Sequence, residues 1–509
     1  MSWKFRLIAR GGRLASRGGG GPSYGPLSDR YPLRVSLRLY DTATRAVRDF
    51  VPRVPGEVGI YLCGLTVQSP PHIGHLRSAV NYDVLSRWLA HSGYKVTFIR
   101  NITDIDDKVL AKSAEAGVPF WSLAYANERI LADHYARLGI RQPTYEPRAT
   151  GHIPEMHQLI EKLIAGGHAY RAEDGSGDVY FDVKTYPEYG RLSGQHLDSM
   201  QAAEDGLARA KRDPRDFALW KGAKPDEPAG AAWPSPWGPG RPGWHIECSA
   251  MCWRLLGAEF DIHGGGLDLV FPHHENEVAQ SRAAGLGFAR FWVHHGLLNL
   301  GGAKMGKSTG NMIDLPQIET SGVRPVELRY YLASPHYRSV IDYSESAVRE
   351  AAAAYRRVEG FVARASELVG DRANRVGTGA VCAEFVEVMD DDLNTSKALA
   401  TVHDVIHEGN TAIAEGDHTV AAGALASVRA MLDILGLDPL SPQWTKSSDS
   451  SSGLRAVVDS LVALALEQRA AARARKDWAA ADAVRDDLKQ AGIAVEDTPQ
   501  GARWTIEGS

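Results

Sequence analysis

The sequence predicts an α/β protein: a Rossmann-like parallel-sheet domain with an inserted α+β connective subdomain, then a helical bundle and a small C-terminal domain. Three observations support this fold class. A strand, a helix and a second strand follow one another within residues 57–99. A proline-rich, irregular region separates this unit from a second block of polar residues at 244–308. Beyond Ser344 the chain is rich in alanine at helical spacing.

The first unit has clear boundaries. The short apolar run 58–63 predicts a buried strand, and apolar residues from Leu76 to Leu89 recur at helical spacing until Gly93 stops the helix. The run 96–99 predicts a second strand. Two strands around one helix favour a parallel pair, because a βαβ crossover returns the chain in the same direction. Further along, we expect a helix at 154–164 and a strand at 179–183.

We expect five regions along the chain. They are a basic, glycine-rich tail at 1–35; the sheet domain at 36–343, with its insertion at about 120–240; a helical bundle at 344–440; a serine-rich linker at 441–453; and a final domain at 454–509. The tail holds seven basic residues and one acidic residue. It is explained equally by an organellar transit peptide, a disordered extension or a misassigned start codon.

Composition excludes several classes of protein. No apolar run approaches the roughly 18 to 20 residues that span a bilayer, so we expect no membrane association. The net charge of -5 argues against nonspecific binding to duplex DNA. Four cysteines are too few for a disulfide framework and indicate a reducing compartment, such as the cytoplasm.

Two imidazoles lie where the first loop becomes a helix. His72 and His75 flank Gly74, which lets a ligand approach the backbone. A helix N-terminus offers free N–H groups and a positive dipole end, so this site suits a phosphate group. The alternative interpretation is a helix cap with histidines facing solvent.

A second motif is lysine-rich. Lys304, Lys307 and Ser308 lie in a loop bracketed by glycines. Two lysines here can neutralise the charge that develops on a leaving pyrophosphate. A solvated basic loop is the alternative, and the lysine motif gains weight only when it is paired with the histidine motif.

Four further side chains could bind a metal ion. Cys63 follows the first strand, Cys248 opens a helical segment, and His273 and Glu277 are four residues apart on one predicted helix face. Two thiolates, an imidazole and a carboxylate form a plausible zinc set. From spacing alone the signal is weak, because buried cysteine usually serves packing.

Together these motifs resemble those of class I aminoacyl-tRNA synthetases, and the intervening segments resemble the cysteinyl-tRNA synthetase family. The matching stretches are 62–67, 101–108, 240–251, 260–266 and 271–277, and the likeness runs from about residue 36 to 504. One departure from the family pattern is Gly306, which stands between the lysines where a serine is usual.

The resemblance implies specific site residues and a specific chemistry. It implies one Zn²⁺ per chain on Cys63, Cys248, His273 and Glu277, and a cysteine pocket lined by Thr66, Trp244, His263 and Asp268. It implies that ATP, with Mg²⁺, is bound by His72, Gly74, His75, Lys304, Lys307 and Ser308, with the two histidines and two lysines as the catalytic groups. The activity implied is activation of L-cysteine to an adenylate and its transfer to the 3′-terminal ribose of tRNA(Cys).

The resemblance also implies that residues 297–343 form the lysine loop and a stem-contact region, and that the C-terminal domain reads the anticodon. Arg469, Arg473 and Lys476 are expected on one helix face, where they would neutralise phosphates, and Trp504 is expected to stack on a base. A solvated helix face and a small-domain core are the alternatives. For Trp478 we expect the core.

Two other functions compete with this one. An amide ligase of the mycothiol pathway would pass activated cysteine to an amino sugar, but such ligases lack a long helical and anticodon-reading C-terminus. A noncatalytic tRNA-binding paralogue is the other rival, and Gly306 is its only support. We expect a monomer whose partners are tRNA(Cys), L-cysteine and ATP.

Overall fold

The computed structural model describes residues 37–202, 210–225, 227–228, 230–304, 312–370, 381–498 and 501–506. The expected tail at 1–35 therefore lies outside the described residues.

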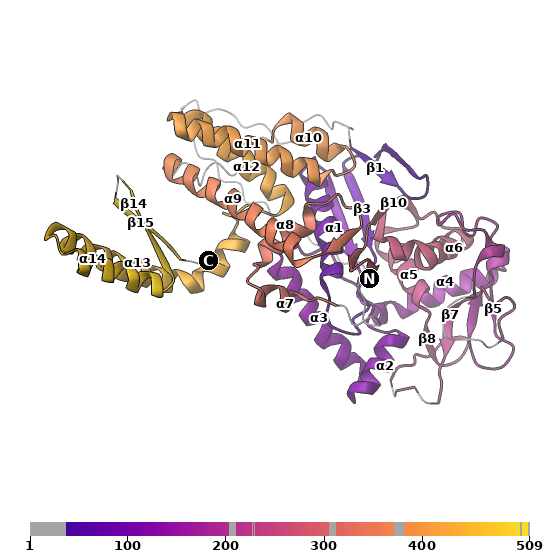
Figure 1. Ribbon diagram of the computed structural model, residues 1–509. Helices are drawn as coiled ribbons and strands as arrows, with labels where there is room; N and C mark the ends of the chain where they lie inside the picture. The colour runs from indigo at the N-terminus through magenta and orange to yellow at the C-terminus, as the bar shows by residue number, and fades with distance from the viewer. Residues whose placement is uncertain are drawn as a thin grey trace, which may run out of the picture.

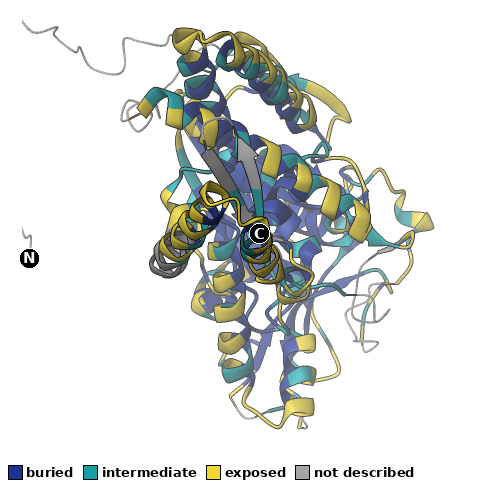
Figure 2. Ribbon diagram, turned by 60° about the vertical axis from the view of Figure 1, so that its left-hand side comes forward, coloured by how far each residue is buried: buried dark blue, intermediate teal, exposed yellow. Residues whose placement is uncertain are grey.

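The centre of the protein is a parallel sheet with strand order β10-β9-β3-β4. Its strands are β3 (Glu57–Leu62), β4 (Lys95–Arg100), β9 (Phe260–Gly266) and β10 (Ala289–His295). Every residue of β9 is buried, as expected for a sheet covered on both faces. Figure 2 shows this buried interior in dark blue. The predicted βαβ unit and the Rossmann-like fold class are confirmed.

Helix α1 (Ile73–His91) connects β3 to β4. Its apolar residues at the predicted spacing, including Leu76, Val80 and Leu89, are fully buried. The helix ends before Gly93, whose φ of 91° is a left-handed conformation that favours glycine. Its N-terminus lies at the carboxyl edge of the sheet, so the histidine motif is placed beside the end of β3.

The inserted subdomain contains a second, antiparallel sheet of order β5-β6-β7-β8. Its strands are β5 (Ala169–Arg171), β6 (Val179–Phe181), β7 (Phe217–Gly222) and β8 (Gly240–Pro242), and helix α4 (Ile153–Ala165) precedes them. Strand β8 leads directly into α5 (Trp244–Leu256), and Gly243 N–H donates to Leu219 O over 2.9 Å. The insertion therefore fixes the start of α5.

Other elements surround the main sheet. They are β1 (Arg38–Asp41), β2 (Ala46–Asp49), α2 (Asp107–Ala116), α3 (Phe120–Arg137), α6 (Glu275–Ala283), α7 (Leu315–Thr320) and α8 (Pro325–Ala333). A small sheet of order β12-β11-β13 follows β10; its strands are β11 (Leu298–Leu300), β12 (Ala303–Lys304) and β13 (Ile341–Tyr343).

The helical bundle packs against one end of the sheet domain (Figure 1). Its helices are α9 (Glu345–Val369), α10 (Ala383–Asp390), α11 (Thr395–Glu415) and α12 (His418–Leu435). By length and composition α12 is apolar enough to cross a membrane, with hydropathy 1.2, but half of that window is buried inside the protein. Leu425, Val428 and Leu432 of α12 are fully buried, which is the pattern of a bundle core helix.

The C-terminal module lies apart from the sheet domain, at the left of Figure 1. It consists of α13 (Pro442–Ala474), α14 (Trp478–Gln490) and the hairpin β14 (Ile493–Thr498) and β15 (Gly501–Ile506). The expected serine-rich linker at 441–453 is wrong, because α13 begins at Pro442. Proline fits the first turn of a helix, and serine costs a helix only a fraction of a kcal/mol per residue, about 0.5 relative to alanine.

Candidate active site and metal centre

The site lies where the strand order of the main sheet reverses. From β3 the chain passes to β4 on one side, and β9 pairs with β3 on the other. Open parallel sheets bind ligands beyond the carboxyl ends of their strands at such a point. Cys63 follows the last residue of β3, and Gly64 beside it is held by its N–H donating to Asn101 Oδ1 over 2.8 Å.

Four side chains from distant segments converge there. The Sγ atoms of Cys63 and Cys248 are 3.7 Å apart. Cys63 Sγ lies 3.4 Å from Glu277 Oε1, which lies 3.0 Å from His273 Nε2. His273 is carried by the turn before α6, and Glu277 by the first turn of α6, so the expected four-residue spacing does place their side chains together.

The sulfur–sulfur distance fits two ligands of one tetrahedrally coordinated metal ion. Zinc–sulfur bonds of about 2.3 Å place two ligand sulfurs about 3.8 Å apart, close to the observed 3.7 Å. Potential ligand atoms of all four side chains lie within 4.8 Å of one another. Cys63, His263, His274 and Glu277 form a second possible set under the same limit. Because both sets share Cys63 and Glu277, they describe one cluster; only the first contains two thiols.

Neighbouring groups orient these side chains. His263 Nε2 lies 2.8 Å from the second carboxylate oxygen of Glu277, and both side chains are fully buried. His245 Nδ1 is 3.1 Å from His273 Nδ1, and the Trp244 ring stacks on His273 with centroids 4.3 Å apart. Trp244 therefore contacts the cluster through His273, whereas His263 contacts it through Glu277.

The residues of the cluster shift one another's pKa values. Burial alone would raise the pKa of Glu277, but His263 and His273 hold it at about 2. Burial opposes the charged form of His273 too, yet Glu277 and Cys248 raise its pKa to about 10. Burial raises the pKa of Cys63, while contacts with Cys63 and His273 lower the pKa of Cys248 to about 6 against the burial effect. These shifts favour one carboxylate and one thiolate, which are species that a metal ion binds, whereas His273 and Cys63 would each release a proton when the metal binds.

His72 and His75 cap helix α1. His72 Nδ1 accepts the Gly74 N–H over 3.1 Å, and His75 Nδ1 accepts the His72 N–H over 3.2 Å. The rings lie 3.7 Å apart, and both side chains are half-buried. In this arrangement each histidine satisfies a helix N–H through one ring nitrogen.

The β11–β12 hairpin that leads into the lysine motif starts beside this cap, since a Cβ on Gly74 would lie 4.0 Å from Leu298 Cβ. Lys304 ends β12, while Lys307 and Ser308 lie outside the described residues. The chain beyond the motif returns to α1, since Ile73 N–H donates to Ile313 O over 2.9 Å. The described segment that follows the lysine motif therefore lies beside the N-terminus of α1, although more than two hundred residues separate them in sequence.

Thr66 and Asp268 lie at the rim of the site. Thr66 forms an isolated parallel bridge with Thr103 and is partly exposed. Asp268 is exposed on the short turn after β9, and a Cβ on Gly266 would lie 2.3 Å from its Oδ1. Gly266 thus permits Asp268 to fold back over the end of β9.

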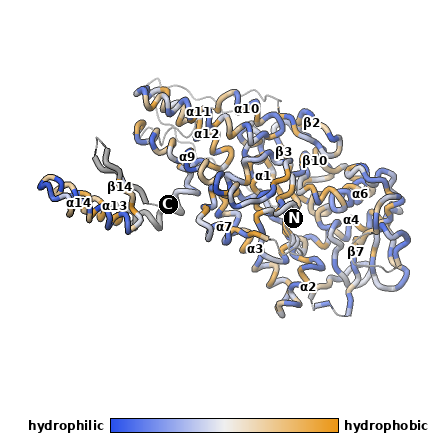
Figure 3. Tube along the Cα trace, in the orientation of Figure 1, coloured by the Kyte–Doolittle hydropathy of each residue, from blue (hydrophilic) through white to orange (hydrophobic). Residues whose placement is uncertain are grey.

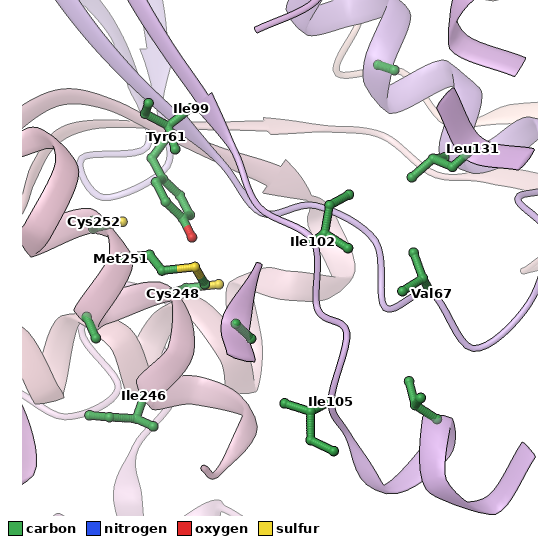
Figure 4. Packing of buried hydrophobic residues seen from close by; sticks show 14 of the residues in the cluster. Tyr61, Val67, Ile99, Ile102, Ile105, Leu131, Ile246, Cys248, Met251 and Cys252 are labelled. Carbon is green, nitrogen blue, oxygen red and sulfur yellow. The ribbon is translucent and has the colours of Figure 1, made fainter. Parts of the chain in front are cut away.

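Sequence reasoning missed several buried polar groups around the cluster. His274 Nδ1 lies 2.7 Å from His294 Nε2, and His294 Nδ1 lies 2.7 Å from Thr42 Oγ1. Tyr61 is fully buried with its ring projecting toward Cys248 and Cys252 (Figure 4), and its hydroxyl has no hydrogen-bond partner among the described residues. The doubled histidines at 273–274 and 294–295, each near a strand end, were the available signal.

The remaining cysteines and one acidic residue are explained by packing. Cys252 is fully buried in the main core, and Cys382 packs near Met431, with their sulfurs 3.8 Å apart. Glu275 is buried and accepts the Ser193 N–H over 2.8 Å, so it anchors the inserted subdomain to α6.

In the C-terminal module the expected basic face is only partly present. Arg469 is 8% exposed, while Arg473 is exposed. Lys476 lies beyond the end of α13 with a φ of 62°. The expectation of a core position for Trp478 is wrong: as the first residue of α14, it is 59% exposed. Trp504 is partly buried, pairs with Val495 across the hairpin and packs against the small core cluster of Val462, Leu488 and Ile493.

Family models match three parts of the chain. Residues 49–353 match the class I tRNA synthetase (C) catalytic domain, residues 384–439 a DALR domain, and residues 458–504 the cysteinyl-tRNA ligase anticodon-binding domain.

Relatives match nearly the whole chain. A cysteine–tRNA ligase of a Nocardioides species is 56% identical over 475 residues, which cover 93% of this chain and all of the relative. One from Streptomyces avermitilis is 55% identical over 472 residues, covering 93% of this chain and 99% of the relative. A Mycobacterium tuberculosis methionyl-tRNA synthetase in complex with methionyl-adenylate shares the fold, with a TM-score of 0.52, 16% identity, and coverage of 75% of this chain and 92% of that structure. The chain therefore belongs to the cysteine–tRNA ligases, within the class I aminoacyl-tRNA synthetases.

Proposed function

We propose that the protein activates L-cysteine with ATP and transfers it to the 3′-terminal ribose of tRNA(Cys). The observation that carries this proposal is the convergence of Cys63, Cys248, His273 and Glu277 beside Trp244, next to the N-terminus of α1. A thiol-binding pocket and a phosphate-binding helix end thus share one edge of the sheet.

The metal ion proposed is Zn²⁺, one per chain. When bound, zinc would hold the substrate thiol as a thiolate and so favour cysteine over serine. This selectivity matters because a hydrophobic pocket separates near-isosteres by only about 10- to 200-fold. His263 would keep Glu277 oriented through its second oxygen, and His245 would do the same for His273.

Activation joins the cysteine carboxylate to the α-phosphorus of ATP. A carboxylate oxygen forms the new bond while the bond to the β-phosphate oxygen breaks, and pyrophosphate leaves with its Mg²⁺. The proposed roles of His72 and His75 are to donate from their outer nitrogens to phosphate oxygens, because their Nδ1 atoms already accept helix N–H groups. Gly74 lets the nucleotide approach, and Lys304, Lys307 and Ser308 neutralise the triphosphate.

The remaining assignments concern the pocket and tRNA. Thr66, Trp244 and Asp268 are proposed to line the cysteine pocket, with Asp268 facing the substrate ammonium. Transfer then follows when a terminal ribose hydroxyl attacks the activated carbonyl and releases AMP. The C-terminal module is proposed to hold the anticodon through Trp504, Arg473 and Lys476. The buried Arg469 is left with a packing role. We propose a cytoplasmic monomer.

The test is cysteine-dependent ATP–pyrophosphate exchange by the full chain, with zinc content measured on the same sample. Exchange with cysteine, none with serine, and charging of tRNA(Cys) are expected. A ligase that passes cysteine to an amino sugar would exchange but not charge tRNA, and a regulatory paralogue would bind tRNA without exchange. The match of residues 458–504 to an anticodon-binding model argues against the first rival.

A further inference from the structure

Arg77 is a buried cation one turn beyond the histidine motif. Its side chain is fully buried, and burial lowers the pKa of the guanidinium to about 10, so it remains charged at neutral pH. Its five acceptors among the described residues are all backbone carbonyl oxygens rather than carboxylates. They belong to Gly296 at 2.7 Å, Leu297 at 2.9 Å, Ser339 at 2.5 Å, and His336 and Tyr337 at 3.4 Å.

These carbonyls belong to two strand-entry segments that meet. Gly296 N–H donates to Tyr337 O over 2.8 Å, and Ile341 N–H donates to Leu297 O over 3.0 Å. The contact is so close that a Cβ on Gly296 would lie 2.2 Å from Ser339 O. The first segment leads into β11 and the second into β13, and β11 pairs with β12, which ends at Lys304. Arg77 therefore joins helix α1 to the base of the strands that lead into the lysine motif.

Asp392 holds the other side of the second segment. This carboxylate is buried, and it accepts the Tyr337 hydroxyl over 2.6 Å and the Arg338 Nε–H over 2.7 Å. Asp392 and Leu393 have φ values of 61° and 52°, which are costly for side chains other than glycine. The turn between α10 and α11 is thus held in a strained form by its contacts with the segment 336–339.

We propose that Arg77 is a positioning residue for cysteine activation: it sets the distance between the α1 N-terminus, with His72 and His75, and the β11–β12 hairpin that leads to the lysines. Asp392 stabilises the same register from the bundle side. The inference rests on the proposed roles of the histidines and lysines. Its physical basis is the forked geometry of the guanidinium, which binds several carbonyls at once, whereas a lysine ammonium cannot reproduce that fork.

The test compares Arg77→Lys with Arg329→Lys. Arg329 is the control, because it is also fully buried with its pKa lowered to about 10 by burial. It donates to the carbonyls of Leu138 and Leu435 and, unlike Arg77, to a buried carboxylate, that of Asp83, and these contacts lie away from the β11–β12 hairpin. Exchange rates are normalised to zinc-loaded, folded enzyme. We expect Arg77→Lys to lower kcat at least tenfold, about what a sub-ångström misplacement of catalytic groups costs, while KM for cysteine stays within about twofold.

Arg329→Lys should lower the melting temperature similarly but leave kcat within about twofold. Equal kcat losses in the two variants would overturn the inference, since both losses would then reflect general destabilisation of the fold. If Arg77→Lys does not fold, Asp392→Asn replaces it and should lower kcat about threefold or more with KM for cysteine unchanged; an unchanged kcat would overturn the inference. Lys307→Ala distinguishes a failure of this inference from a failure of the proposed function. A large loss of kcat in Lys307→Ala with no loss in Arg77→Lys rejects only the positioning role of Arg77. No loss of kcat in Lys307→Ala rejects the proposed role of the lysine itself.

Discussion

The sheet domain and the C-terminal module bury different kinds of side chain. At the carboxyl edge of the main sheet, Arg77, His263 and Glu277 are fully buried together with their hydrogen-bonding partners. In the described part of the C-terminal module, the hydrophobic core consists of Val462, Leu488 and Ile493 with partly buried neighbours, and Arg469 is the one buried charged residue. Figure 3 shows hydrophilic and hydrophobic segments alternating along α13 and α14.

This difference suits the two regions to different tasks, cysteine chemistry in the sheet domain and tRNA binding in the C-terminal module. Buried polar groups act strongly because water does not compete with them, but each needs a fixed partner, which a large core provides. A thin module with exposed cations and aromatic rings suits a large, solvated ligand such as RNA. We therefore expect substitutions in the first region to change cysteine chemistry, and those in the second to change tRNA affinity.

The largest effect is expected for Cys248→Ala. Removal of one ligand should weaken zinc binding more than the 10- to 100-fold typical of residues that only orient ligands, and discrimination against serine should fall by orders of magnitude. Chelator competition and metal analysis give the affinity. Cys252→Ala is the matched control, because this buried thiol lies one turn further along α5 and outside the cluster. Full zinc occupancy in Cys248→Ala would remove that residue from the ligand set.

Lys307→Ala should lower the rate of adenylate formation by about 10²-fold, or about 2.7 kcal/mol, because its charge is needed as pyrophosphate leaves. KM for cysteine should change much less, and pre-steady-state pyrophosphate release measures both. Gly306→Ser, which restores the usual family residue, should change the rate only modestly. A wild-type rate in Lys307→Ala contradicts a phosphate-neutralising role.

Removing residues 446–509 should sharpen the contrast between the two regions. The first turn of α13 is retained because Trp444 Nε1–H donates to Gly436 O over 3.2 Å and its ring packs on the bundle core. Cysteine activation should stay within about twofold, while kcat/KM for tRNA should fall about 10- to 100-fold, through lost stacking and phosphate contacts. Unimpaired charging would mean that the module does not read tRNA.

The smallest effects are expected from the two tryptophans of the module. Trp478→Ala removes an exposed ring. The loss of its stacking on a base should weaken tRNA binding by about 1 kcal/mol, roughly fivefold, without lowering the melting temperature of the protein. Trp504→Ala should weaken binding and also lower the melting temperature of the module, because this side chain packs against the module's core cluster. Titrations at two salt concentrations, combined with thermal unfolding, distinguish them. Equal stability of both variants would contradict the packing role of Trp504.

Local sequence patterns predicted helices and strands well where the element buries one clear apolar face. The β3-α1-β4 unit, helix α4 and strand β6 lie where apolar spacing placed them, since each has a single buried face or a short apolar run. The same reasoning failed at residues 441–453, where serine content suggested a linker, and at Trp478, where spacing suggested burial. In both cases the outcome depends on what packs alongside, which composition does not encode.

The sequence by itself determined the family, the order of the elements and the residue types able to bind zinc and phosphate, because these are properties of contiguous motifs. Only the tertiary structure brought Cys63 and Cys248 together, 185 residues apart in sequence and 3.7 Å apart in space. The four-residue spacing already predicted the contact of His273 with Glu277, but only the structure placed His263 on the second oxygen of Glu277 and directed Arg77 to the carbonyls that precede β11 and β13. The physical reason is that a buried polar group takes its partners from whichever segments the fold packs around it, and chain spacing carries no record of those contacts.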